Sequence, residues 1–472
     1  MTEEKKLRLV VLGGGPGGYA AAFLAADRGW SVTLVDPEEN PGGVCLHRGC
    51  IPSKALLHLA RVMAEAEEAA GQGITFGRPE IDLDRVRAWK EEVVRKQTGG
   101  TGQLARLRRL RHLRGEGRFL GRDRVQVKLA GGDGEEVPFD RAVIATGSRP
   151  AELPFLPFAE ERIMDSTDAL ELPELPERLL VVGGGYIGLE LGQVYAALGS
   201  RVTLVEMMDR ILPGADKDLV HYLRRNLKKR FDAIHTGVKI ADAGIRKNGV
   251  QVTLEGGRGE AEKKRFDRVL VAVGRRPLTD GLGLEEAGVE LDHNGFIRVD
   301  GQRRTSARGI FAIGDVAGEP MLAHKASAEA RVAVEAMAGE KAAWDPRAIP
   351  AVVFTDPEVA WAGLTEEEAR AQGRRVRLLK FPWAANGRAN ITARGEGLTK
   401  LVVNPGTERL LGVGIVGAGA GELVAEGVLA MEMGALATDL GLAIHPHPTL
   451  SETLMEAGDL FGGPSVHYLS RK

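Results

Sequence analysis

The chain of 472 residues contains two cysteines, Cys45 and Cys50, which lie close together near its N-terminus. A disulfide between them would close a small loop, and loop entropy would add little to its stability, so the bond would be readily reducible. A permanent structural disulfide is uncommon in a reducing compartment, where a lone close pair is more often catalytic or metal-binding. These residues at this spacing therefore indicate thiol–disulfide exchange.

The residues around the pair favour a reactive thiol at Cys50. Pro52 suits the first turn of a helix, which would place Cys50 at a helix N-terminus, where the helix dipole favours the thiolate. Two alternatives stay open at this point: two unrelated buried thiols, or a zinc site that includes His47 as Cys-x-His-x-x-Cys. No further cysteine exists to complete a zinc site, so we expect no metal.

A thiol couple needs a proton acceptor, and the run HPHPTLSE at residues 445–452 offers one. A histidine can accept a proton near neutral pH, and a carboxylate can fix its tautomer and orientation. Taken alone, the run would by default be read as two histidines in a proline-rich turn.

The elements that must position these residues come from a repeat. Residues 7–36 and residues 178–206 each read as an apolar run, a glycine cluster, a helical segment and a second β-branched run that ends in an acid. The two acids, Asp36 and Glu206, lie at the same distance after the first glycine of their copies. This is the βαβ fingerprint of dinucleotide binding, and its presence twice makes an ordinary glycine turn improbable.

Each glycine has a physical role in this fingerprint. The first makes the tight turn, the second lets the backbone approach the pyrophosphate, and the third allows close helix–strand packing. The helix N-terminus offers free N–H groups to the phosphates. The glycines in these roles are Gly13, Gly15 and Gly18 in the first copy and Gly183, Gly185 and Gly188 in the second.

The acid that ends the second copy bears on the choice of nicotinamide cofactor. Glu206 would repel a 2′-phosphate, which favours NAD over NADP. Arg210 lies nearby in the sequence, and we interpret it as a solvated surface charge.

Further short strands end in glycine turns, at residues 143–150, 269–277 and 305–315. The last ends in Gly314 and Asp315. An acid at the end of a strand suits a polyol hydroxyl such as a ribityl chain, but taken alone the residue is better explained as a turn Asp satisfied by its own backbone.

Composition sets the class of protein. The formal net charge of −2 gives no basic excess that would indicate nucleic acid, and the apolar and charged fractions are those of a globular protein. No uninterrupted apolar run is long enough to span a membrane, and the N-terminal apolar run is too short for a signal sequence. We expect a cytoplasmic protein.

Several motifs in a fixed order carry a resemblance to a known family. They are GGGPGGY at 13–19, GGVCLHRGCIPSK at 42–54, ATGSRP at 145–150, GGGYIGLE at 183–190, AIGD with MLAHKA within 312–326, and HPHPTLSE at 445–452. Together they resemble the class I pyridine nucleotide–disulfide oxidoreductases, from about residue 7 to the C-terminus. The cysteine motif is highly specific, whereas other flavoenzymes share the glycine motifs.

The resemblance implies that the first fold binds FAD and the second binds NAD, and that Lys54 and Glu190 pair beside the flavin N5. The implied FAD contacts are Gly13, Gly15, Pro16, Gly18, Asp36, Gly43, Lys54, Gly117, Thr146, Gly147, Ser148, Asp315, Met321, Leu322, Ala323 and His324. The implied NAD-fold residues are Gly183, Gly185, Ile187, Gly188, Glu190, Glu206, Val238 and Gly274.

The resemblance also implies the roles of four catalytic residues. Cys45 would be the thiol that exchanges with substrate, and Cys50 the thiol that faces the flavin. His447 would be the base and Glu452 its orienting partner, and both would act on the cysteines of the opposite subunit. A homodimer with two composite sites is therefore expected.

Within the family, the chain is most similar to members that oxidise protein-bound dihydrolipoamide with NAD. That activity implies as partners the lipoyl domain of an E2 acyltransferase, or the H protein of glycine cleavage, and the peripheral subunit-binding domain of E2. The alternatives are a glutathione reductase-like member, which would use NADPH, and a non-enzymatic flavoprotein subunit. Glu206 argues against the first, and the complete set of Cys and His–Glu residues argues against the second.

These elements predict an α/β fold with two Rossmann-like domains and an α+β dimerisation domain. The expected domains are 1–150 for FAD, 151–278 for NAD, 279–346 returning to FAD, and 347–472 for the interface. Residues 52–115 are expected to be a helical excursion from the first domain. It includes the basic run at 106–114, which could contact an acidic partner but is interpreted as a solvated helix face.

Overall fold

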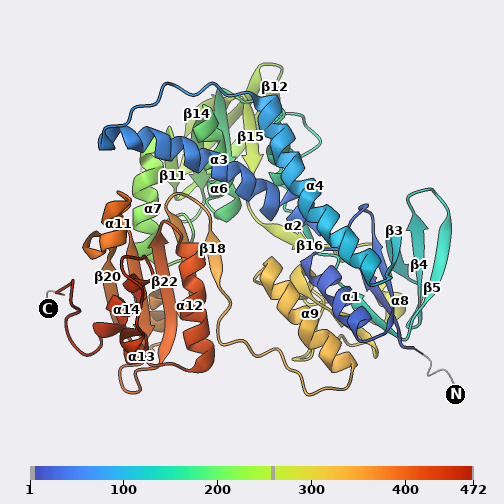
Figure 1. Cartoon of the computed structure of the whole chain (residues 1–472). Helices are drawn as coiled ribbons and strands as arrows, with labels where there is room; N and C mark the ends of the chain where they lie inside the picture. Colours follow the sequence, from blue (N-terminus) through green and yellow to red (C-terminus); the bar gives the residue numbers. More distant parts are fainter. Residues whose placement is uncertain (1–5, 257–260, 470–472) are drawn as a thin grey trace.

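The computed structural model describes residues 6–256 and 261–469 (Figure 1). The chain forms three regions, each built on its own main sheet. In Figure 1 the first region lies at the lower right, the second, mostly green, lies above, and the third, orange to red, lies at the lower left.

The first region is built on a seven-stranded sheet in the order β17-β6-β1-β2-β3-β4-β5. The strands from β17 to β3 pair in parallel, and β4 and β5 continue the sheet as antiparallel strands. The strands are β1 (Arg8–Leu12), β2 (Ser31–Asp36), β3 (Arg111–Phe119), β4 (Arg124–Leu129), β5 (Gly134–Pro138), β6 (Arg141–Ile144) and β17 (Ile310–Ala312). Strand β17 brings a segment from late in the chain back into this sheet.

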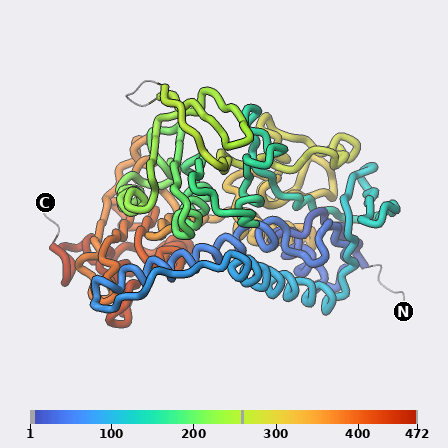
Figure 2. Tube along the Cα trace, turned by 90° about the horizontal axis from the view of Figure 1, so that it is seen from above, coloured from blue at the N-terminus to red at the C-terminus, as the bar shows by residue number. Residues whose placement is uncertain are grey.

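Helices cover the parallel part of this sheet and extend beyond it. Figure 2 shows α3 and α4 along one edge of the molecule, with α3 extending toward the third region and α4 running back over the first. The helices are α1 (Pro16–Asp27), α2 (Gly43–Arg48), α3 (Cys50–Glu68), α4 (Leu83–Leu107), α8 (Leu284–Ala287) and α9 (Ala323–Met337), with the 3-10 turns η1 (Ala69–Gln72) and η2 (Gly314–Ala317).

The basic run at 106–114 is not one helix face, contrary to the expectation. Helix α4 ends at Leu107, the positive φ of Arg109 turns the chain, and Arg111 begins strand β3. Strand β3 pairs in parallel with β2, so part of the run belongs to the sheet. Pairing with a strand far away in the sequence overrides the local helical pattern here.

The second region repeats this design with a five-stranded parallel sheet in the order β11-β10-β9-β15-β8. Its strands and helices are β8 (Ile163–Met164), α5 (Ser166–Glu171), β9 (Arg178–Val182), α6 (Tyr186–Leu198), β10 (Arg201–Glu206), α7 (Lys217–Arg230), β11 (Ala233–Thr236) and β15 (Arg268–Val271). A separate antiparallel sheet contains β12 (Val238–Arg246), β13 (Gly249–Gly256) and β14 (Glu262–Phe266). The short strands β7 (Ser148–Pro150) and β16 (Arg275–Pro277) link the two regions as an antiparallel pair.

The two sequence repeats form turns with equivalent close contacts in these sheets. A side chain on Gly13 would meet the Ala145 carbonyl oxygen at 2.3 Å, and one on Gly18 would meet the Gly13 oxygen at 1.8 Å. The equivalent contacts of Gly183 and Gly188 are 2.3 Å and 2.2 Å. Both turns therefore require glycine, because strand and helix backbones touch there.

The third region is a five-stranded antiparallel sheet with helices packed against it, in the order β18-β19-β22-β21-β20. Its strands are β18 (Ala351–Val353), β19 (Glu358–Gly363), β20 (Arg377–Pro382), β21 (Leu398–Val403) and β22 (Leu410–Gly417). Its helices are α10 (Glu366–Ala371), α11 (Gly387–Ile391), α12 (Ala420–Met433), α13 (Ala437–Leu442) and α14 (Glu452–Asp459), with the 3-10 turn η3 (Trp383–Ala385). It is the α+β region that the sequence predicts.

Candidate active site

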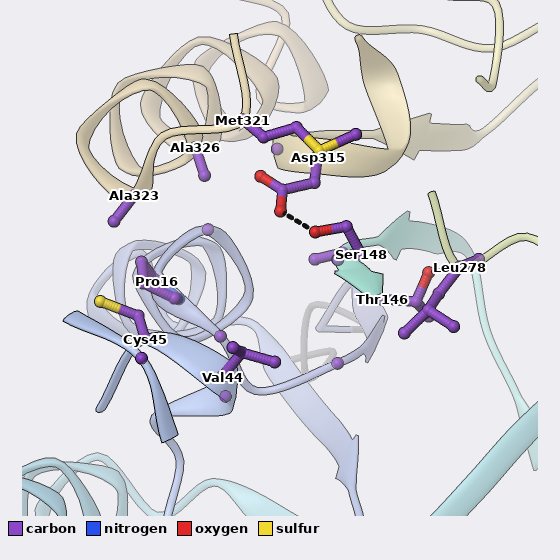
Figure 3. Close-up of a pocket in the computed structure, with 18 of the residues that line it drawn as sticks. Pro16, Val44, Cys45, Thr146, Ser148, Leu278, Asp315, Met321, Ala323 and Ala326 are labelled. Atoms are coloured by element: carbon purple, nitrogen blue, oxygen red, sulfur yellow. Dashed lines mark hydrogen bonds between the residues drawn. The ribbon is translucent and has the colours of Figure 1, made fainter. Parts of the chain in front are cut away.

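A cavity of about 540 Å³ opens where the first two regions meet, at the carboxyl ends of the parallel strands. Its walls come from the first glycine turn, the cysteine segment, the ends of β2 and β6, and the start of α9 (Figure 3). The predicted site residues on its wall are Gly13, Gly15, Pro16, Asp36, Gly43, Cys45, Cys50, Lys54, Gly117, Thr146, Gly147, Ser148, Ile187, Glu190, Asp315, Met321 and Ala323.

The first glycine turn fits a pyrophosphate. Helix α1 begins with Pro16, and the end of the helix faces the cavity with its free N–H groups. Asp36 is 5% exposed and accepts the Gly14 N–H at 2.5 Å and the Glu38 N–H at 3.0 Å. Burial raises the pKa of Asp36, and these two N–H groups oppose that rise. The residues present therefore fit an adenine dinucleotide such as FAD.

Asp315, on η2, also lines the cavity. The Ser148 hydroxyl donates to the Asp315 carboxylate at 2.5 Å, and Figure 3 shows the two groups facing each other. The Arg275 guanidinium donates to the Ser148 hydroxyl at 2.8 Å and to its carbonyl at 2.7 Å. Buried Glu329 accepts the Gly314 N–H at 2.6 Å and holds the turn. Asp315 is thus oriented by side chains, and a polyol hydroxyl would find both a donor and an acceptor there.

The two cysteines lie at the junction of α2 and α3, with Cys50 as the first residue of α3. A hydrogen bond from the Cys45 thiol lowers the pKa of Cys50 to about 7, against the opposing effect of burial and with help from the Lys54 charge. The same hydrogen bond and burial raise the pKa of Cys45. The structure therefore makes the thiols unequal, with the negative charge on Cys50.

The Lys54–Glu190 pair joins all three regions beside the cysteines. Lys54 Nζ lies 2.8 Å from Glu190 Oε2 and 4.6 Å from the centre of the Phe354 ring. Glu190, on α6, is 2% exposed, and its other oxygen accepts the Phe354 N–H at 2.9 Å. A buried carboxylate is stable here because both of its oxygens have partners.

The second glycine turn copies the first but lies away from the cavity wall. Glu206 Oε2 accepts the Gly184 N–H at 2.6 Å, as Asp36 does in the first turn. Val238 begins β12, and Gly274, with a φ of 130°, precedes β16. The end of this sheet can hold a second dinucleotide.

Arg210 is not the solvated charge that we expected. Its guanidinium forms two hydrogen bonds with the Glu367 carboxylate, contacts the Pro213 carbonyl, and leaves the side chain 18% exposed. Because Glu367 belongs to the third region, sequence proximity to Glu206 gave no sign of this partner.

The His–Glu pair predicted at residues 445–452 is present on the third region. His447 Nδ1 lies 2.8 Å from Glu452 Oε1, and the Thr449 N–H donates to Glu452 Oε2 at 2.7 Å. Burial of the Glu452 carboxylate tends to raise its pKa, but these contacts hold the pKa of Glu452 below its usual range. The His447 side chain is 70% exposed, and neither residue lies on the cavity wall.

Three other predicted cofactor residues also lie off the wall. Gly18 packs against the Gly13 backbone, Leu322 caps α9, and His324 Nε2 bonds to the Pro350 carbonyl. Two residues that sequence reasoning missed do line the cavity, Arg275 and Tyr186, and burial raises the pKa of Tyr186 to about 12. The similarity of the turns ATGSRP and VGRRP could have drawn attention to Arg275, which lies in the second turn.

Two negative findings apply to the described residues 6–256 and 261–469. No three His, Cys, Asp or Glu side chains gather there in a way that could hold a metal ion, and His47 Nε2 lies 2.9 Å from the Asn40 carbonyl oxygen. No helix in the same ranges is long and apolar enough to cross a membrane.

Comparisons with known proteins indicate one family for the whole chain. The family described as pyridine nucleotide-disulphide oxidoreductase matches residues 7–330, and the dimerisation domain of that family matches residues 349–458. A dihydrolipoyl dehydrogenase of Vibrio parahaemolyticus is 48% identical over 100% of this chain and 99% of its own. A dihydrolipoyl dehydrogenase of Thermus scotoductus is 48% identical over 99% of this chain and 100% of its own.

Solved structures give the same result. LpdA from Mycobacterium tuberculosis has a TM-score of 0.89 and 28% identity, and the match covers 96% of this chain and 99% of that one. The Cu(II) complex of the flavoprotein disulfide reductase RclA from Escherichia coli has a TM-score of 0.86 and 29% identity, covering 97% and 100%. These matches confirm the predicted fold class and the family's cofactors, FAD and NAD. The chain belongs to the pyridine nucleotide–disulphide oxidoreductase family.

Proposed function

We propose that the chain is a dihydrolipoyl dehydrogenase that oxidises protein-bound dihydrolipoamide to lipoamide and reduces NAD to NADH. The observation that carries this proposal is the position of the Cys45–Cys50 pair on the wall of a cavity whose other walls fit FAD. The full-length relatives named dihydrolipoyl dehydrogenase support the substrate.

The two thiols have separate roles in this proposal. Cys45 exchanges with the substrate, and Cys50 carries the charge and faces the flavin. The low pKa of Cys50 supports this division, because the better leaving group of a disulfide is the sulfur with the more stable thiolate. Attack on Cys45 therefore expels Cys50.

His447 acts as the base and Glu452 orients it, on the cysteines of a second copy. The exposure of His447 away from its own cavity supports this, as do the exposed apolar side chains beside it. Those side chains are Leu429, Met433, Leu442 and Ile444, which are 63–100% exposed. The dimerisation domain of the family covers the same region.

The reaction begins when one thiol of dihydrolipoamide gives its proton to His447 of the partner subunit. The resulting thiolate attacks Cys45 Sγ, the Cys45–Cys50 bond breaks, and Cys50 leaves as a thiolate. The second substrate thiol then attacks the substrate sulfur bound to Cys45, which closes the lipoyl ring and releases Cys45, and the proton of that thiol passes to the departing Cys45 sulfur. When bound, FAD supplies the two-electron carriage that returns the dithiol to the disulfide and delivers hydride to NAD.

Glu206 and Arg210 determine NAD preference in this proposal. The Glu206 carboxylate would repel a 2′-phosphate, and Arg210 is engaged by Glu367 rather than free to bind one. Lys54 and Glu190 lie beside the redox centre as a fixed charge pair. The remaining glycine-turn and strand-end residues predicted above hold the two dinucleotides.

The partners follow from the substrate. A lipoyl group is carried on the lipoyl domain of an E2 acyltransferase or on the H protein of glycine cleavage, so one of these presents the dithiol. We propose attachment to the peripheral subunit-binding domain of E2 for the same reason.

A steady-state assay of the purified holoenzyme tests the proposal. It compares dihydrolipoamide with NAD against oxidised glutathione with NADPH, for the wild type and for Cys45→Ser. We expect activity only with the first pair, and its loss in Cys45→Ser.

Activity only with glutathione and NADPH would overturn the substrate but not the fold. Near wild-type oxidation of dihydrolipoamide by Cys45→Ser would overturn the roles of the thiols.

A further inference from the structure

A second His–Glu pair stands one helical turn from the first. His467 Nδ1 lies 2.5 Å from Glu456 Oε1, and the His467 N–H donates to Glu456 Oε2 at 3.4 Å. Glu452 is held in the same way, by the His447 ring and the Thr449 N–H. Each carboxylate is thus hydrogen-bonded to one imidazole nitrogen and to one backbone N–H.

The two carboxylates are neighbours on α14. Glu452 and Glu456 lie at i and i+4, and they are 7% and 2% exposed. Two like charges at this spacing repel each other, and a buried carboxylate without a partner is costly. The pair of acids therefore needs compensating charge at both positions, and the two imidazoles are placed to supply it.

The last described segment of the chain is fixed by packing that places His467. The Tyr468 ring lies edge-on to Phe381 with ring centres 6.0 Å apart, and Ser465 Oγ donates to the Tyr468 carbonyl at 3.3 Å. The Arg377 guanidinium stacks 4.6 Å from the centre of the Phe461 ring and donates to the Leu460 carbonyl. His467 is 56% exposed at its side chain, so it remains open to protonation.

The charges around His467 favour its protonated form. The hydrogen bond and the charge of Glu456 raise the pKa of His467, and Glu452 adds to that rise. In turn, His447 and His467 both help to lower the pKa of Glu452. The charged groups that face this cluster are Glu452, Glu456, the two histidines and Asp459, the last residue of α14, whose pKa is raised by burial and by the charge of Glu456. Arg377 of β20 donates to a backbone carbonyl instead.

We propose that His467 is a positioning residue for the base: it neutralises Glu456, so that of the two neighbouring carboxylates Glu452 and Glu456 only Glu452 acts on His447 with its full charge. The proposal rests on the role of His447 given above. It extends the proton-accepting site from two residues to four, and it assigns the C-terminal segment a part in the thiol half-reaction.

Replacement of His467 by glutamine tests the charge. Glu456 would then be left as an uncompensated anion one helical turn from Glu452, the partner of His447, and would favour the protonated base. We expect the ascending limb of the pH profile of kcat/KM for dihydrolipoamide to move to higher pH by about half a pH unit, so that the rate at a fixed pH on that limb falls about threefold.

Three matched variants separate charge from shape. His467→Lys retains a cation beside Glu456 and should restore the wild-type profile, as should the double variant Glu456→Gln with His467→Gln, which removes both charges. His293→Gln alters an exposed histidine on a distant loop and should leave the profile unchanged. A pH profile of His467→Gln equal to wild type, or a shift that the lysine and double variants do not reverse, would overturn the proposal.

Two further measurements test the role of His447 as the base independently of the His467 proposal. Reduction of an artificial acceptor by NADH uses the flavin without the base, so it should be unchanged in every His467 and Glu456 variant. His447→Gln should lower dihydrolipoamide oxidation by about a hundredfold or more. If it does not, the role of His447 is wrong, whatever the His467 variants show.

Discussion

Replacement of Cys45 can separate its covalent role from the hydrogen bond that it gives to Cys50. That hydrogen bond is the largest cause of the low pKa of Cys50, about 7. Cys45→Ser keeps a hydroxyl that can donate, whereas Cys45→Ala removes the donor. Neither variant can form the disulfide, so Cys50 is the single thiol in both.

The size of the effect follows from the strength of a hydrogen bond to a charged group. Such a bond contributes about 1.5–3 kcal/mol, which corresponds to about one to two pH units in the titration of Cys50. In the alanine variant the thiolate fraction at pH 7 should fall from about one-half to between about one-tenth and one-hundredth. Lys54 remains in both variants, so its attraction lowers the pKa of Cys50 in each and does not enter the difference between them.

The flavin itself provides the assay. A thiolate in contact with oxidised flavin gives a long-wavelength charge-transfer absorbance, so a pH titration of each oxidised holoenzyme variant reports the charge on Cys50. We expect the band to appear as pH rises, with a midpoint near neutrality in Cys45→Ser and a higher midpoint in Cys45→Ala.

Two outcomes would refute this reasoning. Equal midpoints in the two variants would mean that the hydrogen bond from Cys45 does not set the charge on Cys50. No band in Cys45→Ser at any pH would mean that Cys50 does not face the flavin.

Three further predictions concern the surrounding residues. Gly18→Ala should prevent folding, because its Cβ would lie 1.8 Å from a backbone oxygen of the same turn. In Gly15→Ala the new Cβ would lie 3.9 Å from its nearest neighbour, so this variant should fold but release FAD. Circular dichroism reports the folding, and flavin fluorescence reports the release of FAD. Glu206→Ser should lower the ratio of kcat/KM for NAD over NADP about tenfold or more, because a repulsion of the 2′-phosphate is lost. Lys54→Met should lower the free energy of unfolding by about 2 kcal/mol in urea denaturation, because Glu190 keeps only its backbone partner.

The parts of the site that lie within short motifs could be predicted from the sequence. The glycine turns, the cysteine segment and the His447–Glu452 pair each depend on residues a few positions apart, so local spacing carries their geometry. The Lys54–Glu190 pair joins distant motifs, and only resemblance to a family brought these two residues together before the structure did.

The parts that were missed or misjudged depend on pairing across the chain. Arg275 reaches Ser148 only because β16 pairs with β7, and Arg210 loses its solvent exposure only because Glu367 packs against it from the third region. Arg111 appears helical by its neighbours but pairs with β2. In each case a contact between segments far apart in sequence decides the outcome, and no local pattern contains it.

The near identity of the two glycine turns shows where cofactor choice must come from. Both turns carry equivalent backbone contacts, and in both a terminal acid accepts the N–H of the residue after the first glycine: Asp36 accepts from Gly14 at 2.5 Å, and Glu206 accepts from Gly184 at 2.6 Å. A turn that is the same in both places cannot distinguish FAD from NAD. The difference lies in what faces each turn: the first looks onto the cysteines and Asp315, whereas the second does not. Two copies of one dinucleotide motif therefore acquire different roles through the segments that pack opposite them.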